Sequence, residues 1–354
     1  MTDRGASSRV IDLFDRASRR VDDGDGTVIH PVFTDADPTF LNYHAWKLRW
    51  ADRQRSCDMA EAVLQHSLNS GASRAQGARR RNGLALRTLA WQARWRGAFE
   101  DAEDLAHRAV ARLKGEGAPS AIADCQGVLA MVHYVRGRSD LAYECIEVGF
   151  KALEEQDNTS SRIDLLVIRA VADLTARRFQ SAQQSAERAQ LLSSDEERAR
   201  VEHSIARVLL SDDRPGEALE MAFRSVHNCK EYRNFVVLPL ALSAAAASLI
   251  DLDKLDQGEM LLLEALEIAE RENDLLSTAH VKFDLARAKT RQNRLDDALA
   301  LSQSGVDLTA SMEFYVMHIR FLKQLASLQE KLGQTSAALQ NLKALLALRE
   351  VKQG

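Results

Sequence analysis

The chain has 354 residues, and 45% of them are hydrophobic, which is enough to bury a sizeable core. Its 47 Lys and Arg nearly balance its 51 Asp and Glu, and the net charge of −4 gives no support for binding to bulk polyanions. The four cysteines have neither CxxC nor zinc-finger spacing, so we expect reduced thiols, no bound metal and a cytoplasmic location.

The N-terminal segment carries no apolar core of the kind found in signal peptides. Residues 7–21 predict a helix with Val10, Ile11 and Phe14 on one side, and residues 22–38 have the Asp, Gly and Pro content of a linker. We therefore expect two regions. Residues 1–38 form an N-terminal capping helix and linker, and residues 39–354 form the body of the protein.

A repeated pattern of small residues organises that body. It is clearest at Ala90 and Ala102, which stand on either side of a turn at Gly97. The spacing returns at Ala130/Ala142, Ala170/Ala182, Ala206/Ala218, Ala286/Ala298 and Ala326/Ala338, with Leu48/Ala60 and Ala246/Gly258 as variants. The second member of each pair stands at position 60, 102, 142, 182, 218, 258, 298 or 338, and such a fixed period predicts a solenoid.

Each period is long enough for two helices joined by a short turn. Small residues let the two backbones approach closely where the helices cross. We expect eight antiparallel helix pairs, each contacting only its neighbours in the stack. The predicted pairs are 39–55 with 57–69, 73–96 with 99–114, 120–136 with 139–155, 161–177 with 179–193, 195–211 with 215–230, 236–251 with 255–271, 275–292 with 295–309, and 313–332 with 335–350.

These motifs resemble the tetratricopeptide repeat. The run from Gly97 to Ala102 followed by Ala109 matches the family pattern, as does the run from Asn293 to Ala298 followed by Gly305. The resemblance implies an all-α solenoid wound into a right-handed superhelix. The period of about 40 residues, longer than the usual 34, is similar to a variant found in the sensory and regulatory repeat regions of bacterial signalling proteins.

No catalytic motif stands out. The sequence lacks a P-loop, a dinucleotide-binding glycine pattern, HExxH and GxSxG, so we expect no enzyme activity and no cofactor. The longest apolar run, at residues 235–250, contains Pro239 and is short for a bilayer span, so no membrane segment is expected. Because this run is apolar all round, it predicts either a buried core helix or the wall of an apolar pocket or subunit contact.

In the family, the first helix of each repeat lines a concave groove, and the resemblance implies that the matching positions do so here. Arginines and lysines at these positions outnumber the acidic residues that oppose them, which are Asp52, Asp124, Asp164 and Glu330. The groove would therefore be biased towards positive charge and would attract an acidic peptide segment. The alternative is an inner face whose arginines pair with neighbouring carboxylates. The candidate groove residues are Arg49, Arg87, Trp91, Arg94, Tyr134, His203, Arg207, His280, Phe283, Arg287, Arg320 and Lys323.

All four tryptophans, Trp46, Trp50, Trp91 and Trp95, lie in the first helices of repeats 1 and 2. Residues 44–96 hold eleven Lys and Arg against three Asp and Glu. Aromatic rings among arginines can stack on bases or grip a peptide. The plainer interpretation, which we favour, is packing between neighbouring helices with arginine stems over the indoles.

The last predicted helix carries more leucines than one seam can bury, including Leu339, Leu342, Leu345 and Leu346. We expect an exposed apolar strip there, covered either by a second copy in a homodimer or by a following segment of a longer protein.

Taken together, the sequence predicts a non-enzymatic interaction module that binds a protein or peptide partner in its groove. Its resemblance implies the sensory part of a bacterial signalling protein of the diguanylate cyclase, histidine kinase or transcription regulator type. An alternative is a stand-alone receptor for a peptide or small ligand. A weaker alternative is nucleic-acid binding through the basic repeats 1 and 2.

Overall fold

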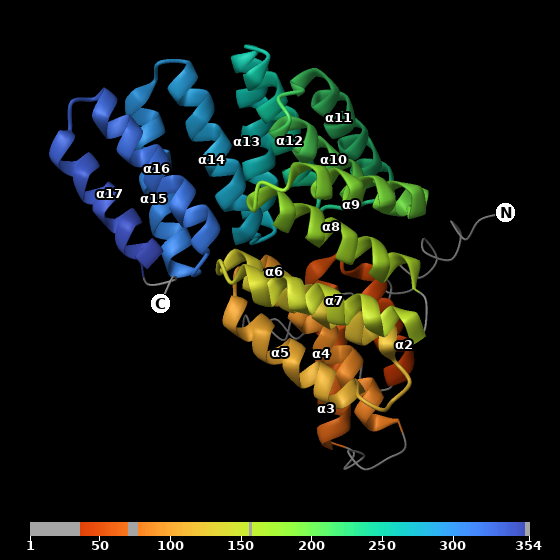
Figure 1. The fold of residues 1–354 in the computed structure, drawn as a ribbon. Helices are drawn as coiled ribbons and strands as arrows, with labels where there is room; N and C mark the ends of the chain where they lie inside the picture. The colour runs from red at the N-terminus through yellow and green to blue at the C-terminus, as the bar shows by residue number, and fades with distance from the viewer. Residues whose placement is uncertain (1–35, 70–76, 156–157, 351–354) are drawn as a thin grey trace, which may run out of the picture.

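The computed structural model describes residues 36–69, 77–155 and 158–350, and every regular element in these ranges is helical (Figure 1). Sixteen α-helices form eight pairs, as predicted. The pairs are α2 (Pro38–Leu48) with α3 (Arg53–Asn69), α4 (Ala78–Trp95) with α5 (Phe99–Leu113), α6 (Pro119–Val135) with α7 (Ser139–Glu155), α8 (Thr159–Thr175) with α9 (Phe179–Leu192), α10 (Arg198–Ser211) with α11 (Pro215–Glu231), α12 (Leu238–Asp251) with α13 (Leu255–Arg271), α14 (Leu275–Arg291) with α15 (Leu295–Ser311), and α16 (Tyr315–Lys331) with α17 (Thr335–Glu350).

Four predicted boundaries are wrong by three residues or more. Helix α3 begins at Arg53 rather than at residue 57, and α4 begins at Ala78 rather than at residue 73. Helix α2 ends at Leu48 rather than at residue 55, and the backbone after it turns so that the Trp50 carbonyl accepts a hydrogen bond from the N–H of Phe235. Helix α10 begins at Arg198, because residues 195–197 form a 3₁₀ turn closed by a capping box between Ser194 and Glu197. The predicted capping helix at residues 7–21 lies outside the described residues.

The turn inside each of repeats 2 to 8 has one geometry. The residue two positions before the second helix has a left-handed backbone conformation. From repeat 2 to repeat 8, this residue is Gly97, Gly137, Arg177, Asp213, Asp253, Asn293 and Gly333. In every case its N–H and the next N–H donate back to the last turn of the first helix, as from Gly97 to the Arg94 carbonyl and from Ala98 to the Ala93 carbonyl. Glycine, Asn and Asp tolerate this conformation best, which explains why the motif recurs in the sequence.

The small anchor residues are buried at the helix crossings. Ala90, Ala102 and their counterparts through Ala286 and Ala298 are fully buried. The approach is closest at Gly305 on α15, where an added Cβ would lie 2.1 Å from the Phe321 ring on α16. Close packing of this kind needs the small side chains that the period predicts.

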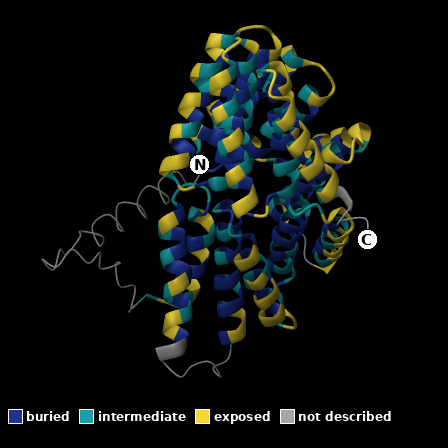
Figure 2. Ribbon diagram, turned by 90° about the vertical axis from the view of Figure 1, so that its left-hand side faces the viewer, coloured by how far each residue is buried: buried dark blue, intermediate teal, exposed yellow. Residues whose placement is uncertain are grey.

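The helices form two layers. The first helix of each repeat contacts the first helix of the next repeat, from α2 and α4 through α14 and α16, and these helices make the inner layer. The second helices cover them, and their outward faces carry most of the exposed residues (Figure 2). Every residue of α12 from Leu238 to Ile250 is buried, as expected for its apolar sequence.

The expectation that repeats contact only their neighbours is wrong. Helix α4 of repeat 2 contacts α14 of repeat 7, and α6 of repeat 3 contacts α16 of repeat 8. Phe99 stacks edge-on against Phe314 with ring centroids 5.9 Å apart, and Gly97 lies directly against Met312. We call these contacts the closure. They unite residues from repeats 2, 3, 6, 7 and 8 in one hydrophobic core, because the superhelix curves until its two ends meet.

Two features of the surface bear on membranes and partners. Within the described part of the chain, no helix combines the length and the apolar character that crossing a bilayer requires.

The expected apolar strip is present on α17, where Leu339, Leu342 and Leu346 are 52%, 37% and 57% exposed, although Leu345 is buried. The homodimer through this strip stays a prediction.

The closure can be tested with two matched glycines that share the same turn geometry. Gly97 has φ 75° and Gly333 has φ 72°, but a Cβ on Gly97 would lie 2.4 Å from the Met312 sulfur, whereas a Cβ on Gly333 meets nothing within 4 Å. Gly333→Ala should cost about 1–2 kcal/mol of unfolding free energy through backbone strain alone. Gly97→Ala should cost about 1 kcal/mol more through overpacking.

The measurement is urea denaturation of both variants, each also combined with Met312→Ala. In the Gly97→Ala background the second substitution should recover part of the extra cost, and in the Gly333→Ala background it should recover none. Equal costs for the two glycine variants would show that the closure does not form in solution.

Candidate functional site

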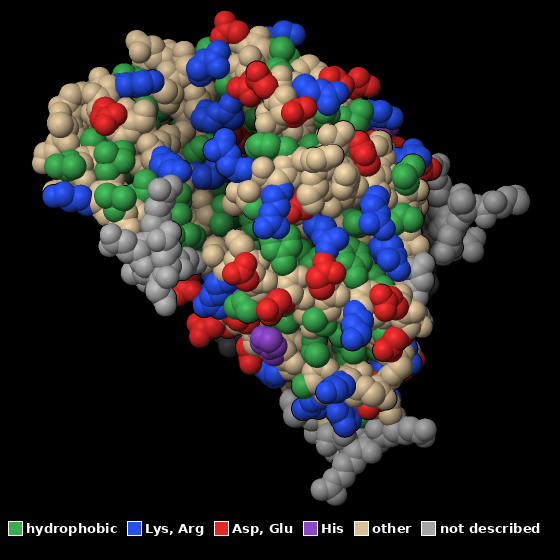
Figure 3. All heavy atoms as spheres, in the orientation of Figure 1, with side chains coloured by type: hydrophobic (Ala, Val, Ile, Leu, Met, Phe, Trp, Pro, Cys, Tyr) green, Lys and Arg blue, Asp and Glu red, His purple; other side chains and the backbone are tan. Residues whose placement is uncertain are grey.

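The inner surface of the C-terminal repeats holds two adjoining hollows. The larger pocket, about 450 Å³, lies between α14 and α16 and is lined by Phe283, Arg287, Thr290, Arg291, Arg320, Lys323, Gln324, Ser327 and Leu328. The smaller pocket, about 220 Å³, is lined by Arg207, Leu210, Ser211, Leu240, Ser243, Ala244, Ala247, Asp251, His280, Asp284, Arg287 and Arg320. Arg287 and Arg320 line both, and we call the two pockets together the C-terminal groove. Figure 3 shows Lys and Arg side chains around a hollow in this part of the molecule.

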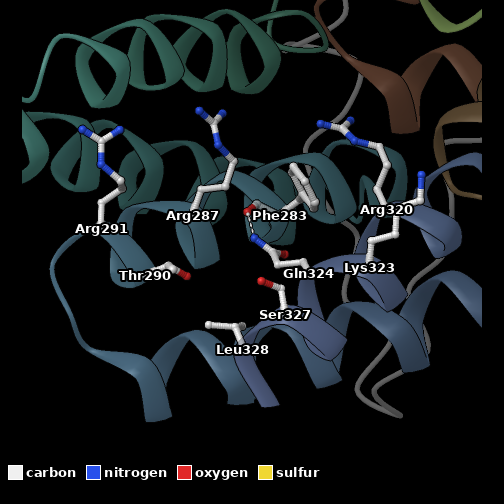
Figure 4. Close-up of a pocket in the computed structure, with 9 residues that line it drawn as sticks. All are labelled: Phe283, Arg287, Thr290, Arg291, Arg320, Lys323, Gln324, Ser327 and Leu328. Carbon is white, nitrogen blue, oxygen red and sulfur yellow. Dashed lines mark hydrogen bonds between the residues drawn. The ribbon is translucent and has the colours of Figure 1, made fainter. Parts of the chain in front are cut away.

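The larger pocket combines an apolar floor with a charged edge. Phe283 and Leu328 supply apolar surface, and Gln324 is held in place because its Nε2 donates to the Phe283 carbonyl at 3.3 Å. In Figure 4 the charged ends of Arg287, Arg291 and Arg320 point to the same side of the pocket. Such a site suits a ligand with one apolar group and one negative group.

In the smaller pocket, one arginine binds both carboxylates. Arg287 donates to Asp251 at 2.7 Å and to Asp284 at 3.1 Å. The Ser243 hydroxyl also donates to Asp284, at 2.8 Å. Both aspartates are therefore already engaged with groups of the protein.

The other two arginines of the smaller pocket have no carboxylate partner. Neither Arg207 nor Arg320 forms an ion pair within 4.0 Å among the described residues. The Arg320 guanidinium lies 4.1 Å from the centre of the Phe283 ring and contacts the Met317 sulfur at 3.2 Å. Burial, together with the charge of Arg207, lowers the pKa of Arg320 to about 10, so Arg320 stays charged at neutral pH.

Two histidines next to these arginines are neutral. Burial and the charge of Arg207 lower the pKa of His203 to about 3. Burial, followed by the charges of Arg207 and Arg320, lowers the pKa of His280 well below its usual value. Both side chains therefore offer hydrogen bonds and no charge at neutral pH.

Six of the predicted groove residues line neither pocket, and His203 and Tyr134 are two of them. The other four, Arg49, Arg87, Trp91 and Arg94, are buried, and the carboxylates that act on the three arginines are Asp124 on α6, Asp164 on α8 and Asp274. Arg87 pairs with Asp124 at 3.0 Å. The surface expected to be open at repeats 1 and 2 is thus interior, and we leave these residues out of the groove.

The tryptophans follow the plainer interpretation. The Trp50 and Trp91 rings meet edge-on at 4.6 Å, and the Arg49 and Arg87 guanidinium groups lie 3.9 Å and 3.6 Å from the centre of the Trp46 ring. Arginines and indoles here pack against one another, which leaves little aromatic face for a base.

Sequence reasoning missed the residues that hold this interior together. Arg53 pairs with Asp274 at 3.4 Å, with the two side chains only 6% and 1% exposed, and this pair joins repeat 1 to repeat 7. Arg200 pairs with Asp164 at 2.7 Å. The sequence does indicate a structural role for Asp274, because this residue precedes helix α14 and its carboxylate caps that helix by accepting from the N–H of Ser277. No local sequence pattern indicates that Arg53 is its partner.

Tyr134, a predicted groove residue, bonds through its hydroxyl to Thr175 at 2.7 Å.

Comparison with known proteins identifies the repeats. Residues 238–311, which contain α12 to α15, match the family described as Tetratricopeptide repeat. This segment carries tetratricopeptide repeats. Both pockets of the C-terminal groove draw on these tetratricopeptide repeats, through α12 and α14. No curated protein sequence matches the chain.

Several solved structures have a fold similar to that of this chain over most of their length. A Rap protein complexed with Competence and Sporulation Factor is 11% identical, with a TM-score of 0.60 over 88% of this chain and 97% of that one. NprR in complex with its cognate peptide NprX is 13% identical, with a TM-score of 0.59 over 87% and 89%. Aspartyl phosphate phosphatase F from Bacillus subtilis is 13% identical, with a TM-score of 0.53 over 98% and 89%. At these identities the likeness establishes the fold.

Metal binding has no support in the part of the chain that the structure describes, since it holds no group of three or more His, Cys, Asp or Glu placed to bind an ion. The four cysteines, three buried and one half-buried, are free thiols. Burial raises the pKa of Cys57 and Cys145 to about 11 and that of Cys229 to about 12, so these thiols are protonated at neutral pH.

The neutral histidines predict a loss of stability in mild acid. When a histidine has a lower pKa in the folded than in the unfolded state, its contribution to the free energy of unfolding is complete above about pH 6.5. That contribution falls as the pH drops towards the pKa of the folded state. For His203, with a folded pKa of about 3, the loss between pH 7.5 and 5.5 should be about 1.4 kcal/mol. Urea denaturation at both pH values should show a smaller loss for His203→Gln than for the parent chain.

The exposed His227 on α11 provides the control, because His227→Gln removes an imidazole from the surface. The idea fails if His203→Gln and the parent chain lose the same unfolding free energy over this interval.

Proposed function

We propose that this chain is a non-enzymatic regulatory module that binds a peptide, or an extended segment of a protein partner, in the C-terminal groove. The observation that carries the proposal is the pairing of an apolar pocket with an adjoining pocket where Arg207 and Arg320 form no ion pair with a carboxylate of the described residues. A groove of this kind offers a place for an apolar side chain and, beside it, for a negative group. The partner is therefore acidic in part.

The structures of similar fold support a peptide as the occupant. One was solved with Competence and Sporulation Factor and another with a cognate peptide, NprX. By this analogy the chain acts in the cytoplasm as the sensory part of a bacterial signalling protein. One of the similar structures reported above has the name of an enzyme, an aspartyl phosphate phosphatase. The Ser243 hydroxyl in the groove donates to Asp284, but Arg287 binds the same carboxylate, so we propose binding alone.

The two alternatives make different use of the surface. A small-ligand receptor would use the same groove, and its ligand would fit within the larger pocket without reaching along the helices. Nucleic-acid binding through repeats 1 and 2 would need the tryptophans and arginines that instead pack in the interior. It would also give affinities that fall steeply with salt concentration.

The test is a selection of peptides from a random library on the immobilised chain, followed by fluorescence anisotropy with the selected peptides. Ser327 is exposed in the larger pocket, so Ser327→Trp should fill it and weaken binding about tenfold or more, without loss of helix content by circular dichroism. Ser336→Trp places the same ring on exposed α17 outside the groove and should leave binding unchanged. Failure to select any peptide, or equal affinity for the Ser327→Trp variant, would refute the proposal.

A further inference from the structure

The smaller pocket has one more positive charge than its own carboxylates can neutralise. Three arginines line it, Arg207, Arg287 and Arg320, against two aspartates, Asp251 and Asp284. Both aspartates are bound by Arg287. Because the two nearby histidines are neutral, one unit of positive charge remains at neutral pH.

This surplus positive charge lowers the stability of the folded chain. Arg207 comes from repeat 5 and Arg320 from repeat 8, and they line the same hollow although repeats 6 and 7 lie between them in the sequence. Two guanidinium groups that share a partly closed pocket repel one another, and neither gains an ion pair in return among the described residues. Some buried arginines elsewhere do pair with a carboxylate, as Arg87 does with Asp124 and Arg53 with Asp274, whereas Arg49 and Arg94 lie against tryptophan rings.

The groups around the two arginines can serve an anion. A guanidinium presents parallel N–H donors that match a carboxylate. His203, one helical turn before Arg207 on α10, has a buried Nδ1 without a hydrogen-bond partner. The pocket also exposes Ser211, and Ser243 stands on its wall.

We infer that the smaller pocket is a carboxylate-binding site, in which Arg207 and Arg320 hold one carboxylate of the peptide while a neighbouring apolar side chain of the same peptide occupies the larger pocket. This inference rests on the proposed function. The carboxylate is either the peptide's C-terminal group or an Asp or Glu side chain. A surplus of one charge matches a carboxylate better than a phosphoryl group, which carries about −1.5 to −2 at neutral pH.

The first experiment compares peptide chemistry on the parent chain. A selected peptide is titrated calorimetrically in three forms: the free acid, the C-terminal amide, and a version with each Asp and Glu changed to Asn and Gln. Exactly one neutralised form should bind about tenfold or more weakly, and it identifies the source of the carboxylate. If all three forms bind equally, the carboxylate site is wrong, while the proposed function stands because the peptide still binds.

The second experiment removes the two arginines. Arg207→Gln and Arg320→Gln should each weaken binding of the acidic form about tenfold or more and should abolish its advantage over the neutral form. Arg271→Gln is the matched control, since Arg271 is exposed at the end of α13, pairs with Glu272 at 3.5 Å and lines neither pocket. It should change affinity little, and the preference for the acidic form should remain.

Thermal denaturation without peptide separates a binding role from a structural one. If Arg207 and Arg320 are kept for a ligand, their Gln variants should melt at the same temperature as the parent or higher, because repulsion is relieved. Arg287→Gln should melt lower, because it leaves Asp251 and Asp284 without their partner. A lower melting temperature for Arg207→Gln and Arg320→Gln, equal to that of Arg287→Gln, would contradict the inference.

Competition with small anions tests the chemical class. Acetate and inorganic phosphate are titrated separately against the bound peptide at constant ionic strength. Acetate should displace the peptide at concentrations comparable to phosphate or lower. Displacement by phosphate alone would overturn the carboxylate assignment in favour of a phosphoryl ligand.

Discussion

The structure depends on the closure, the contact through which repeats 2 and 3 meet repeats 7 and 8. A stack of helix pairs with contacts only between neighbours leaves its concave face open along its whole length. Here the edge-on pair of Phe99 and Phe314, together with Met312 against Gly97, draws the two ends into one core. The concave face is thereby divided into a covered N-terminal part and an open C-terminal groove.

That division decides what the same residue type does at equivalent positions of different repeats. Arg87 and Arg94 stand in repeat 2, on the covered side, where burial without compensation would be costly. Arg87 is compensated by Asp124, and Arg94 lies against the faces of Trp91 and Trp95 at 5.1 Å and 4.9 Å. Arg207 and Arg320 stand on the open side. Arg320 also lies over an aromatic ring, that of Phe283 at 4.1 Å, but neither arginine forms an ion pair within 4.0 Å among the described residues, and both line a pocket that a ligand can enter.

Most of the fold could be predicted from local chemistry. Alanine at the crossings and glycine, Asn or Asp at the left-handed turn position act within one repeat, so eight copies of a weak signal became a strong one. The miss at α2 has a non-local cause, since the Trp50 carbonyl is engaged by Phe235, far along the chain. The closure could not be predicted for the same reason. It depends on how much each repeat rotates relative to the last, a small angle that accumulates over five repeats and that no single motif encodes.

The candidate site was predictable as a set of residues and not as a place. The resemblance to the tetratricopeptide repeat implied Arg207, His280, Phe283, Arg287, Arg320 and Lys323, which all line the two pockets. It could not separate them from Arg49, which is buried. Nor could it show that Arg287 pairs with Asp251 and Asp284 whereas Arg320 pairs with neither. The pair with Asp251 joins two helices, and the pair with Asp284 depends on the rotamers of the two side chains. What separates Arg207 and Arg320 from the buried Arg94, which also has no ion pair among the described residues, is that they line an open pocket, and that is a property of the folded arrangement.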